Sequence, residues 1–203
     1  MNAPTTKKVL VIACGALARE IGDLVEANGL SHVALTCLPA ILHNRPEKIA
    51  GAVQAAIGKA KAEGFEKILI GYADCGTGGA LDKVCQAEGV TRIAGPHCYA
   101  FYWGNAAFAA RGDDDMDAFF LTDFLARQFE AFVVEPLGLD KHPELTEIYF
   151  GNYARLIYLA QSEDAGLTEK ARAAAEFLGL TFEKRVTGYG DLAEFLKATD
   201  KVS

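Results

Sequence analysis

Short apolar runs alternate with amphipathic stretches through the first half of the chain. The segment Lys8–Ala13 carries a continuous apolar run, which is typical of a strand buried on both faces of a sheet. Helical spacing of apolar residues follows over Ala16–Asn28, and a glycine lies just beyond it as a stop signal. The same alternation predicts strands at His32–Thr36, Lys67–Tyr72 and Thr91–Ala94, and helices at Pro46–Glu63 and Ala80–Glu88.

The middle of the chain is less regular, and strand–helix alternation then returns. Gly112–Asp115 is a run of acidic residues after a glycine, which predicts a solvated turn. Helices are expected at Tyr99–Ala110, Thr122–Phe132, Glu144–Asn152, Thr168–Leu178 and Asp191–Ala198, and strands at Arg155–Ala160 and Thr181–Val186.

Strands separated by helices of this length are typical of βαβ units. The pattern therefore predicts an α/β fold of the Rossmann-like type, a parallel sheet flanked by helices, with a second βα set in the C-terminal part. The 203 residues suit a single domain, 1–203, or two lobes, 1–110 and 111–203.

Composition and charge exclude several classes of protein. Lys and Arg number 20 and Asp and Glu number 27, so the net charge of −7 argues against the basic face that nucleic-acid binding requires. The weakly charged stretch 93–110 contains His97, Asn105 and Pro96, so we expect no membrane span. The first apolar run is too short for a secretory signal, which favours the cytoplasm.

The five cysteines supply the most informative chemistry. None belongs to a CxxC pair, and an odd number in a reducing compartment favours free thiols or metal ligands over disulfides. Cys14, Cys75 and Cys98 each come just after an expected strand, and ligands of open α/β sheets bind at the carboxyl ends of the strands. If these thiols converge, they form a plausible soft-metal site. Cys37 and Cys85 are expected in the core.

Other polar groups fall on the same expected edge. His43 and His97 lie in loops that follow strands, and either could serve a ligand or satisfy a loop hydrogen bond. Asp74 directly precedes Cys75. The glycines that follow, Gly76, Gly78 and Gly79, could cradle a phosphate or a carboxylate at the start of a helix, or form a tight turn beside the site.

Several segments together resemble a known family. They are Ala13-Cys14-Gly15, Leu38-Pro39, Leu42-His43-Asn44-Arg45-Pro46, Gly71-Tyr72-Ala73-Asp74-Cys75-Gly76, Pro96-His97-Cys98, Leu137-Gly138-Leu139-Asp140, and Tyr153 with Arg155 and Tyr158. This combination is similar to the uncharacterised family catalogued as domain of unknown function 1638. Members of that family often accompany corrinoid-dependent methyltransferases, so the resemblance implies one-carbon metabolism of methylated amines.

Two functions from different classes remain open. In the first, Cys14, Cys75 and Cys98 hold Zn²⁺ or an iron–sulfur cluster with one coordination position open, and the protein is a metal-dependent enzyme acting on a small molecule. His43, His97 and Asp74 then serve as fourth ligand, as a support for the ligands or as general base. In the second, the protein is a non-catalytic ligand-binding or accessory protein for a corrinoid protein or methyltransferase.

Overall fold

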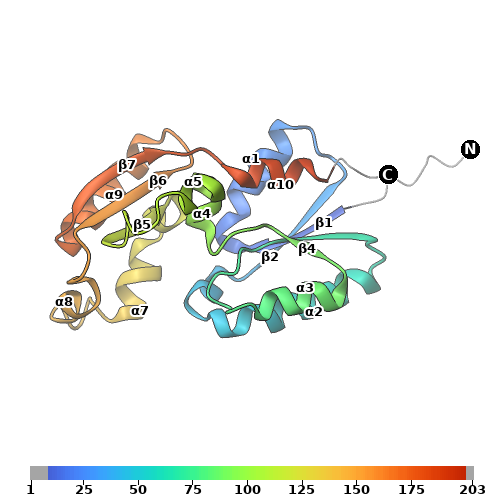
Figure 1. The fold of residues 1–203 in the computed structure, drawn as a ribbon, viewed down its shortest axis with the longest axis horizontal. Coiled ribbons are helices and arrows are strands. Elements are labelled where there is room, and N and C mark those ends of the chain that lie inside the picture. Colours follow the sequence, from blue (N-terminus) through green and yellow to red (C-terminus); the bar gives the residue numbers. More distant parts are fainter. Residues whose placement is uncertain (1–8, 200–203) are drawn as a thin grey trace, which may run out of the picture. The chain divides into compact units, whose positions relative to one another are not determined.

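The computed structural model describes residues 9–199, and these residues divide into two compact units (Figure 1). The first unit contains the described residues up to Phe101 together with those from Asp191 onward, and the second extends from Tyr102 to Gly190. Each unit has its own parallel sheet with helices beside it. The chain therefore has the expected α/β, Rossmann-like architecture with a second βα set.

The first unit is built on four parallel strands in the order β2-β1-β3-β4. These strands are Val9–Cys14 (β1), Val33–Leu38 (β2), Lys67–Gly71 (β3) and Thr91–Arg92 (β4). β1 lies between β2 and β3, and its residues from Val9 to Ala13 pair with both neighbours. None of these five side chains is more than 5% exposed, which explains the uninterrupted apolar run.

Helices cover both faces of this sheet. They are α1 (Ala18–Ala27), α2 (Ile49–Ala62), α3 (Ala80–Glu88) and α10 (Asp191–Lys197), with short 3₁₀ segments η1 (Gly15–Leu17), η2 (Ala40–Asn44) and η3 (Pro46–Lys48). Figure 1 shows α1 and α10 on one side of the sheet and α2 and α3 on the other. Ile49, Val53 and Ile57 of α2 share a core with Ile12 and Ile70. Each such buried side chain contributes about 1.5–3 kcal/mol.

The last helix, α10, belongs to the first unit although it follows the second unit along the chain. It packs against α1 and buries Leu192 and Leu196. The compact units consequently have boundaries near residues 101 and 190, whereas the sequence suggested a boundary near residue 110.

Most elements of the first unit begin and end within two residues of the expected positions. The expected start of the first strand, Lys8, lies outside the described residues. Cys37 is a correction, because it lies inside β2 and is exposed instead of belonging to the core. The reason is that β2 is an edge strand of its sheet, a position that the local pattern does not reveal. Cys85 is buried as expected.

The second unit holds three parallel strands with β6 in the middle. They are Ala118–Thr122 (β5), Arg155–Ala160 (β6) and Thr181–Val186 (β7). Sequence analysis found β6 and β7 but missed β5, which has five residues and runs directly into a helix. Thr122 ends β5 and also caps that helix, since its hydroxyl accepts a hydrogen bond from the Leu125 amide at 3.4 Å.

The remaining helices are short except for the one between β6 and β7. They are α4 (Cys98–Trp103), α5 (Asn105–Ala109), α6 (Asp123–Arg127), the π-helical segment η4 (Glu130–Val134), α7 (Glu135–Leu137), α8 (Leu145–Phe150) and α9 (Ala165–Leu178). Gly104 separates α4 from α5 with a φ of 93°, so the single helix expected over 99–110 is broken there. No helix within residues 9–199 is long and apolar enough to cross a membrane.

The expected turn at Gly112–Asp115 is present, and its first three residues are exposed, but Asp115 needs a correction because its side chain is only 6% exposed. Arg111 lies four residues earlier and binds its carboxylate with two donors, Nε at 2.7 Å and Nη2 at 3.0 Å. A carboxylate is buried at acceptable cost only when it is paired in this way.

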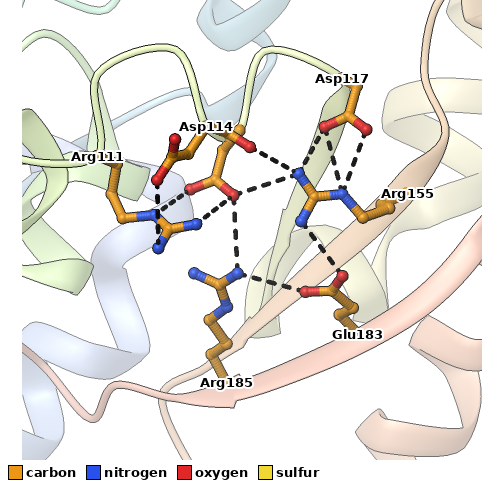
Figure 2. A network of polar contacts seen from close by, with 7 residues as sticks. Arg111, Asp114, Asp117, Arg155, Glu183 and Arg185 are labelled. Carbon is orange, nitrogen blue, oxygen red and sulfur yellow. Dashed lines mark hydrogen bonds and ion pairs between the residues drawn. The ribbon is translucent and has the colours of Figure 1, made fainter.

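This ion pair is part of a network that joins the strands of the second unit. Figure 2 shows the guanidinium of Arg155, the first residue of β6, between Asp117 and Glu183. Arg155 and Arg185 also reach the Asp115 carboxylate, with nitrogen–oxygen distances of 3.4 and 3.7 Å. Positive and negative groups alternate, so the network links segments next to β5, β6 and β7 through attractive contacts.

A buried carboxylate at the other ends of these strands is also fully paired. Asp123 is 3% exposed and accepts hydrogen bonds from the Tyr158 hydroxyl at 2.7 Å, the Ser162 hydroxyl at 2.6 Å and the Gln161 amide at 3.0 Å. These bonds tie the end of β5 to the end of β6, so we assign Asp123 a structural role.

The pairing of Asp115 predicts an acid-sensitive contribution to stability. The hydrogen bonds from Arg111 hold the pKa of this carboxyl below its usual value. Its stabilisation is therefore present above the ordinary carboxyl pKa of about 3.9 and is lost as the pH falls through the lowered folded-state value. We expect Asp115→Asn to cost about 2 kcal/mol of unfolding free energy at pH 7 and much less at pH 3.

Urea unfolding of the wild type and of Asp115→Asn at several pH values measures this effect. Asp114→Asn is the matched control, because that carboxylate is 69% exposed and lies 3.9 Å from Arg111. A loss of stability in Asp115→Asn that stays the same from pH 7 to pH 3 would contradict the interpretation.

Candidate functional site

The three cysteines expected to converge do line one cavity, and all of its lining residues belong to the first unit. Cys14 is the last residue of β1, Cys75 lies in the loop after β3, and Cys98 is the first residue of α4. The cavity measures about 40 Å³ as the space open to the centre of a water-sized sphere. Its lining residues are Cys14, Ala16, Leu17, His43, Ile49, Gly71, Tyr72, Cys75, Cys98 and Phe101.

Two backbone hydrogen bonds bring the Cys75 and Cys98 loops together. The amide of Asp74 donates to Gly95 O at 3.0 Å, and the amide of Cys75 donates to Pro96 O at 2.8 Å. Within residues 9–199, Cys75 is the one residue other than glycine with a positive φ, at 49°. That conformation costs a non-glycine residue about 1–2 kcal/mol. Such strain is typical of functional sites, where the surrounding contacts hold it in place.

A close backbone approach places His43 beside Cys14. Gly15 follows Cys14 directly, and a Cβ at this position would lie 2.8 Å from the carbonyl oxygen of Leu38 and 3.0 Å from the amide of Ala40. Only glycine therefore lets the turn after β1 pack so tightly against the start of η2. His43 lies in η2 and is both exposed to solvent and part of the cavity lining, so it lies at the mouth of the cavity.

Burial and mutual proximity keep the three thiols neutral. Burial, together with the nearby Cys14 sulfur, raises the pKa of Cys75 to about 12. The pKa values of Cys14 and Cys98 are also raised, mainly by burial. Reactive cysteines need the opposite environment, one that lowers the pKa of the thiol. The arrangement thus disfavours a thiolate nucleophile or a redox thiol when no cation is bound.

The residues that line the cavity have suitable chemistry for a metal ion, but their side chains are not arranged to hold one. Three thiols with an imidazole at the mouth are soft ligands, of the kind that zinc and iron–sulfur clusters use. Within residues 9–199, however, no three His, Cys, Asp or Glu side chains are arranged as a ready-made ion site. The chemistry of the residues fits a soft cation, and binding one requires the thiols to reorient and to lose their protons.

The other predicted site residues lie around the cavity and are not part of its lining. His97 packs its ring 4.9 Å from that of Tyr99, and burial lowers its pKa. Asp74 accepts hydrogen bonds from the Thr77 hydroxyl at 2.7 Å and from the amides of Gly79 at 2.9 Å and Gly78 at 3.2 Å. These bonds lower the pKa of its carboxyl, led by the bond from Thr77.

Two backbone amides of the glycine-rich turn before α3 are therefore already hydrogen-bonded to a carboxylate of the protein. Gly76, Gly78 and Gly79 have φ values of 81°, 61° and 80°, which glycine adopts without strain. An external anion at the Gly78 and Gly79 amides would compete with the Asp74 carboxylate that already binds them. The ligand role of these glycines stays a prediction, and the hydrogen bonds give the turn a structural role.

Sequence reasoning missed Tyr72 as a site residue. It directly follows β3, is 2% exposed, and lines the cavity beside the cysteines. Its hydroxyl is buried and has no oxygen or nitrogen partner among the described residues; its hydrogen-bonding neighbour there is the Cys14 thiol, a weak partner. The available signal was its position at the carboxyl end of a central strand, next to the segment Ala73-Asp74-Cys75.

Comparison with known proteins identifies the family to which the chain belongs. The family described as protein of unknown function (DUF1638) matches residues 37–196, and the chain belongs to that family. The matched region includes His43, Cys75 and Cys98, and it begins after Cys14. A search of curated proteins and a search of solved structures each returned no match.

Arg92 fixes the loop on which the site depends. Its guanidinium binds Asp82 of α3 at 2.6 Å through Nε and 3.0 Å through Nη2, and Nη1 donates to Ile93 O at 2.8 Å and Gly95 O at 3.3 Å. Gly95 O is also the acceptor for the Asp74 amide. One side chain thus connects α3 to both cysteine-bearing loops.

We expect Arg92→Met to loosen these loops. Charged hydrogen bonds contribute about 1.5–3 kcal/mol each, so opening should become at least about tenfold more frequent. Iodoacetamide labelling of native protein, followed by mass spectrometry, should show faster modification of Cys75 and Cys98. Lys61→Met is the control, because Lys61 forms an ion pair with Glu88 at 2.7 Å and does not line the cavity. Equal labelling rates in both variants would exclude the positioning role.

Proposed function

We propose that the first unit binds a soft metal ion through Cys14, Cys75 and Cys98 and uses it to act on a small molecule. The observation that carries the proposal is the convergence of three thiols, from three separate segments, on one cavity. Thiolates at such a site repel one another unless a cation neutralises them. No lysine or arginine of residues 9–199 lines the cavity, so we expect the cation to come from solution.

The size of the cavity favours a single zinc ion over an iron–sulfur cluster. A cavity of about 40 Å³ is small compared with the pockets of about 300–1,000 Å³ that hold drug-sized ligands. A cluster of several irons and sulfides would have to displace the loops that carry Cys75 and Cys98. When bound, zinc supplies a Lewis acid that activates a ligand at its open position. His43, at the mouth, then serves as fourth ligand or faces the substrate.

The small size of the cavity also bears on the class of substrate and on the metabolic setting. A cavity this small suits a one-carbon substrate. We propose methylated-amine metabolism in the cytoplasm, beside a corrinoid protein or methyltransferase, as the setting. The absence of a preformed ion site within residues 9–199 favours the second candidate, a non-catalytic ligand-binding or accessory protein for such a methyltransferase.

Metal analysis of anaerobically purified protein tests the metal proposal. We expect about one zinc per chain, no visible colour, and zinc–sulfur distances of about 2.3 Å by X-ray absorption. Cys14→Ser, Cys75→Ser and Cys98→Ser should each lower zinc affinity by about tenfold or more. Cys37→Ser is the matched control, because this exposed cysteine is not part of the cavity lining.

Circular dichroism first establishes that each variant is folded. A brown, iron-containing protein would indicate that the site holds an iron–sulfur cluster instead of zinc. Wild-type protein that neither contains metal nor takes up zinc or iron would refute the metal enzyme and leave the accessory protein. Unchanged metal content in all three serine variants would show that the metal does not bind to these cysteines.

A further inference from the structure

The cavity contains a hydrogen-bond donor that the protein itself pairs only weakly. Tyr72 is 2% exposed and lines the cavity, and its hydroxyl has no oxygen or nitrogen partner among the described residues, where its hydrogen-bonding neighbour is the Cys14 thiol. A buried hydroxyl without a partner costs about 1–3 kcal/mol relative to one that is paired. Tyr158, a buried tyrosine of β6 in the second unit, by contrast donates to the Asp123 carboxylate at 2.7 Å.

The surroundings of Tyr72 define what it can recognise. A tyrosine hydroxyl keeps its proton at neutral pH, so it can donate a hydrogen bond. The neutral thiol of Cys14 is a weak acceptor. The remaining neighbours in the lining include the apolar side chains of Leu17, Ile49 and Phe101. The hydroxyl is thus a donor without a good acceptor in the protein.

We propose that the Tyr72 hydroxyl donates a hydrogen bond to the ligand of this cavity, and that the ligand is a compact molecule carrying an oxygen, sulfur or unprotonated nitrogen acceptor. This inference deepens the proposed function and rests on the same cavity. The small volume of the cavity, about 40 Å³, favours a compact ligand. A protonated amine of the same size has donors only and does not satisfy the hydroxyl.

Three ¹³C-labelled probes of similar size test the inference on zinc-loaded full-length protein. Formate is an anionic acceptor, formamide is a neutral acceptor, and methylammonium has no acceptor. Titrations followed by ¹³C line broadening give an affinity for each. We expect formate or formamide to bind, and Tyr72→Phe to weaken that binding about five- to tenfold with zinc content unchanged. Methylammonium should show no such difference between the two proteins.

Tyr158→Phe is the matched control, because it also removes a buried tyrosine hydroxyl but from the second unit. It should leave probe affinity unchanged. Equal affinity of the acceptor probes for wild type and Tyr72→Phe, or no binding of either probe to wild type, overturns the inference. It is also overturned if Tyr72→Phe lowers zinc affinity and leaves probe affinity intact, since Tyr72 then acts on the Cys14 sulfur.

The same experiment separates this inference from the proposed function. Wild-type protein that takes up no zinc refutes the metal centre. The formate and formamide titrations on metal-free wild type and Tyr72→Phe then decide the role of Tyr72 alone. A five- to tenfold loss in the variant supports it there, and equal affinities overturn it.

Discussion

The parallel pairing of β1 with both β2 and β3 is the constraint on which the first unit depends. Because the three strands run in the same direction, their carboxyl ends reach one edge of the sheet. Cys14 ends β1, and the loop with Cys75 follows β3. Two backbone hydrogen bonds between the loops then add the segment that carries Cys98. The apolar strand core therefore determines where the thiols meet.

The three thiols converge, and their thiolate forms would repel one another. The side chains of residues 9–199 that line the cavity do not offset this repulsion. Burial raises the pKa of all three thiols, and no cationic side chain lines the cavity. A neutral set of thiols is inert, whereas a divalent soft cation would stabilise the thiolates and pull them together. The strained backbone of Cys75 and the weakly paired hydroxyl of Tyr72 both lie at this edge of the sheet, just after β3.

In the second unit, by contrast, the buried carboxylates are paired with other groups of the protein. Asp115 is surrounded by arginines, and Asp123 accepts from hydroxyl and amide donors. Both carboxylates are satisfied inside the protein, so they stabilise the strand ends and leave nothing for a ligand. This contrast between well-paired and weakly paired groups is the reason to place the candidate site in the first unit.

The sequence alone determined the order of strands and helices, because apolar runs and amphipathic spacing are local properties of the chain. It also placed Cys14, Cys75 and Cys98 at strand ends. It did not reveal β5, whose five residues run into a helix, or the exposure of Cys37, which depends on β2 being an edge strand. The burial of Asp115 and the weak pairing of the Tyr72 hydroxyl were decided by tertiary structure, since both depend on which distant side chains arrive as partners.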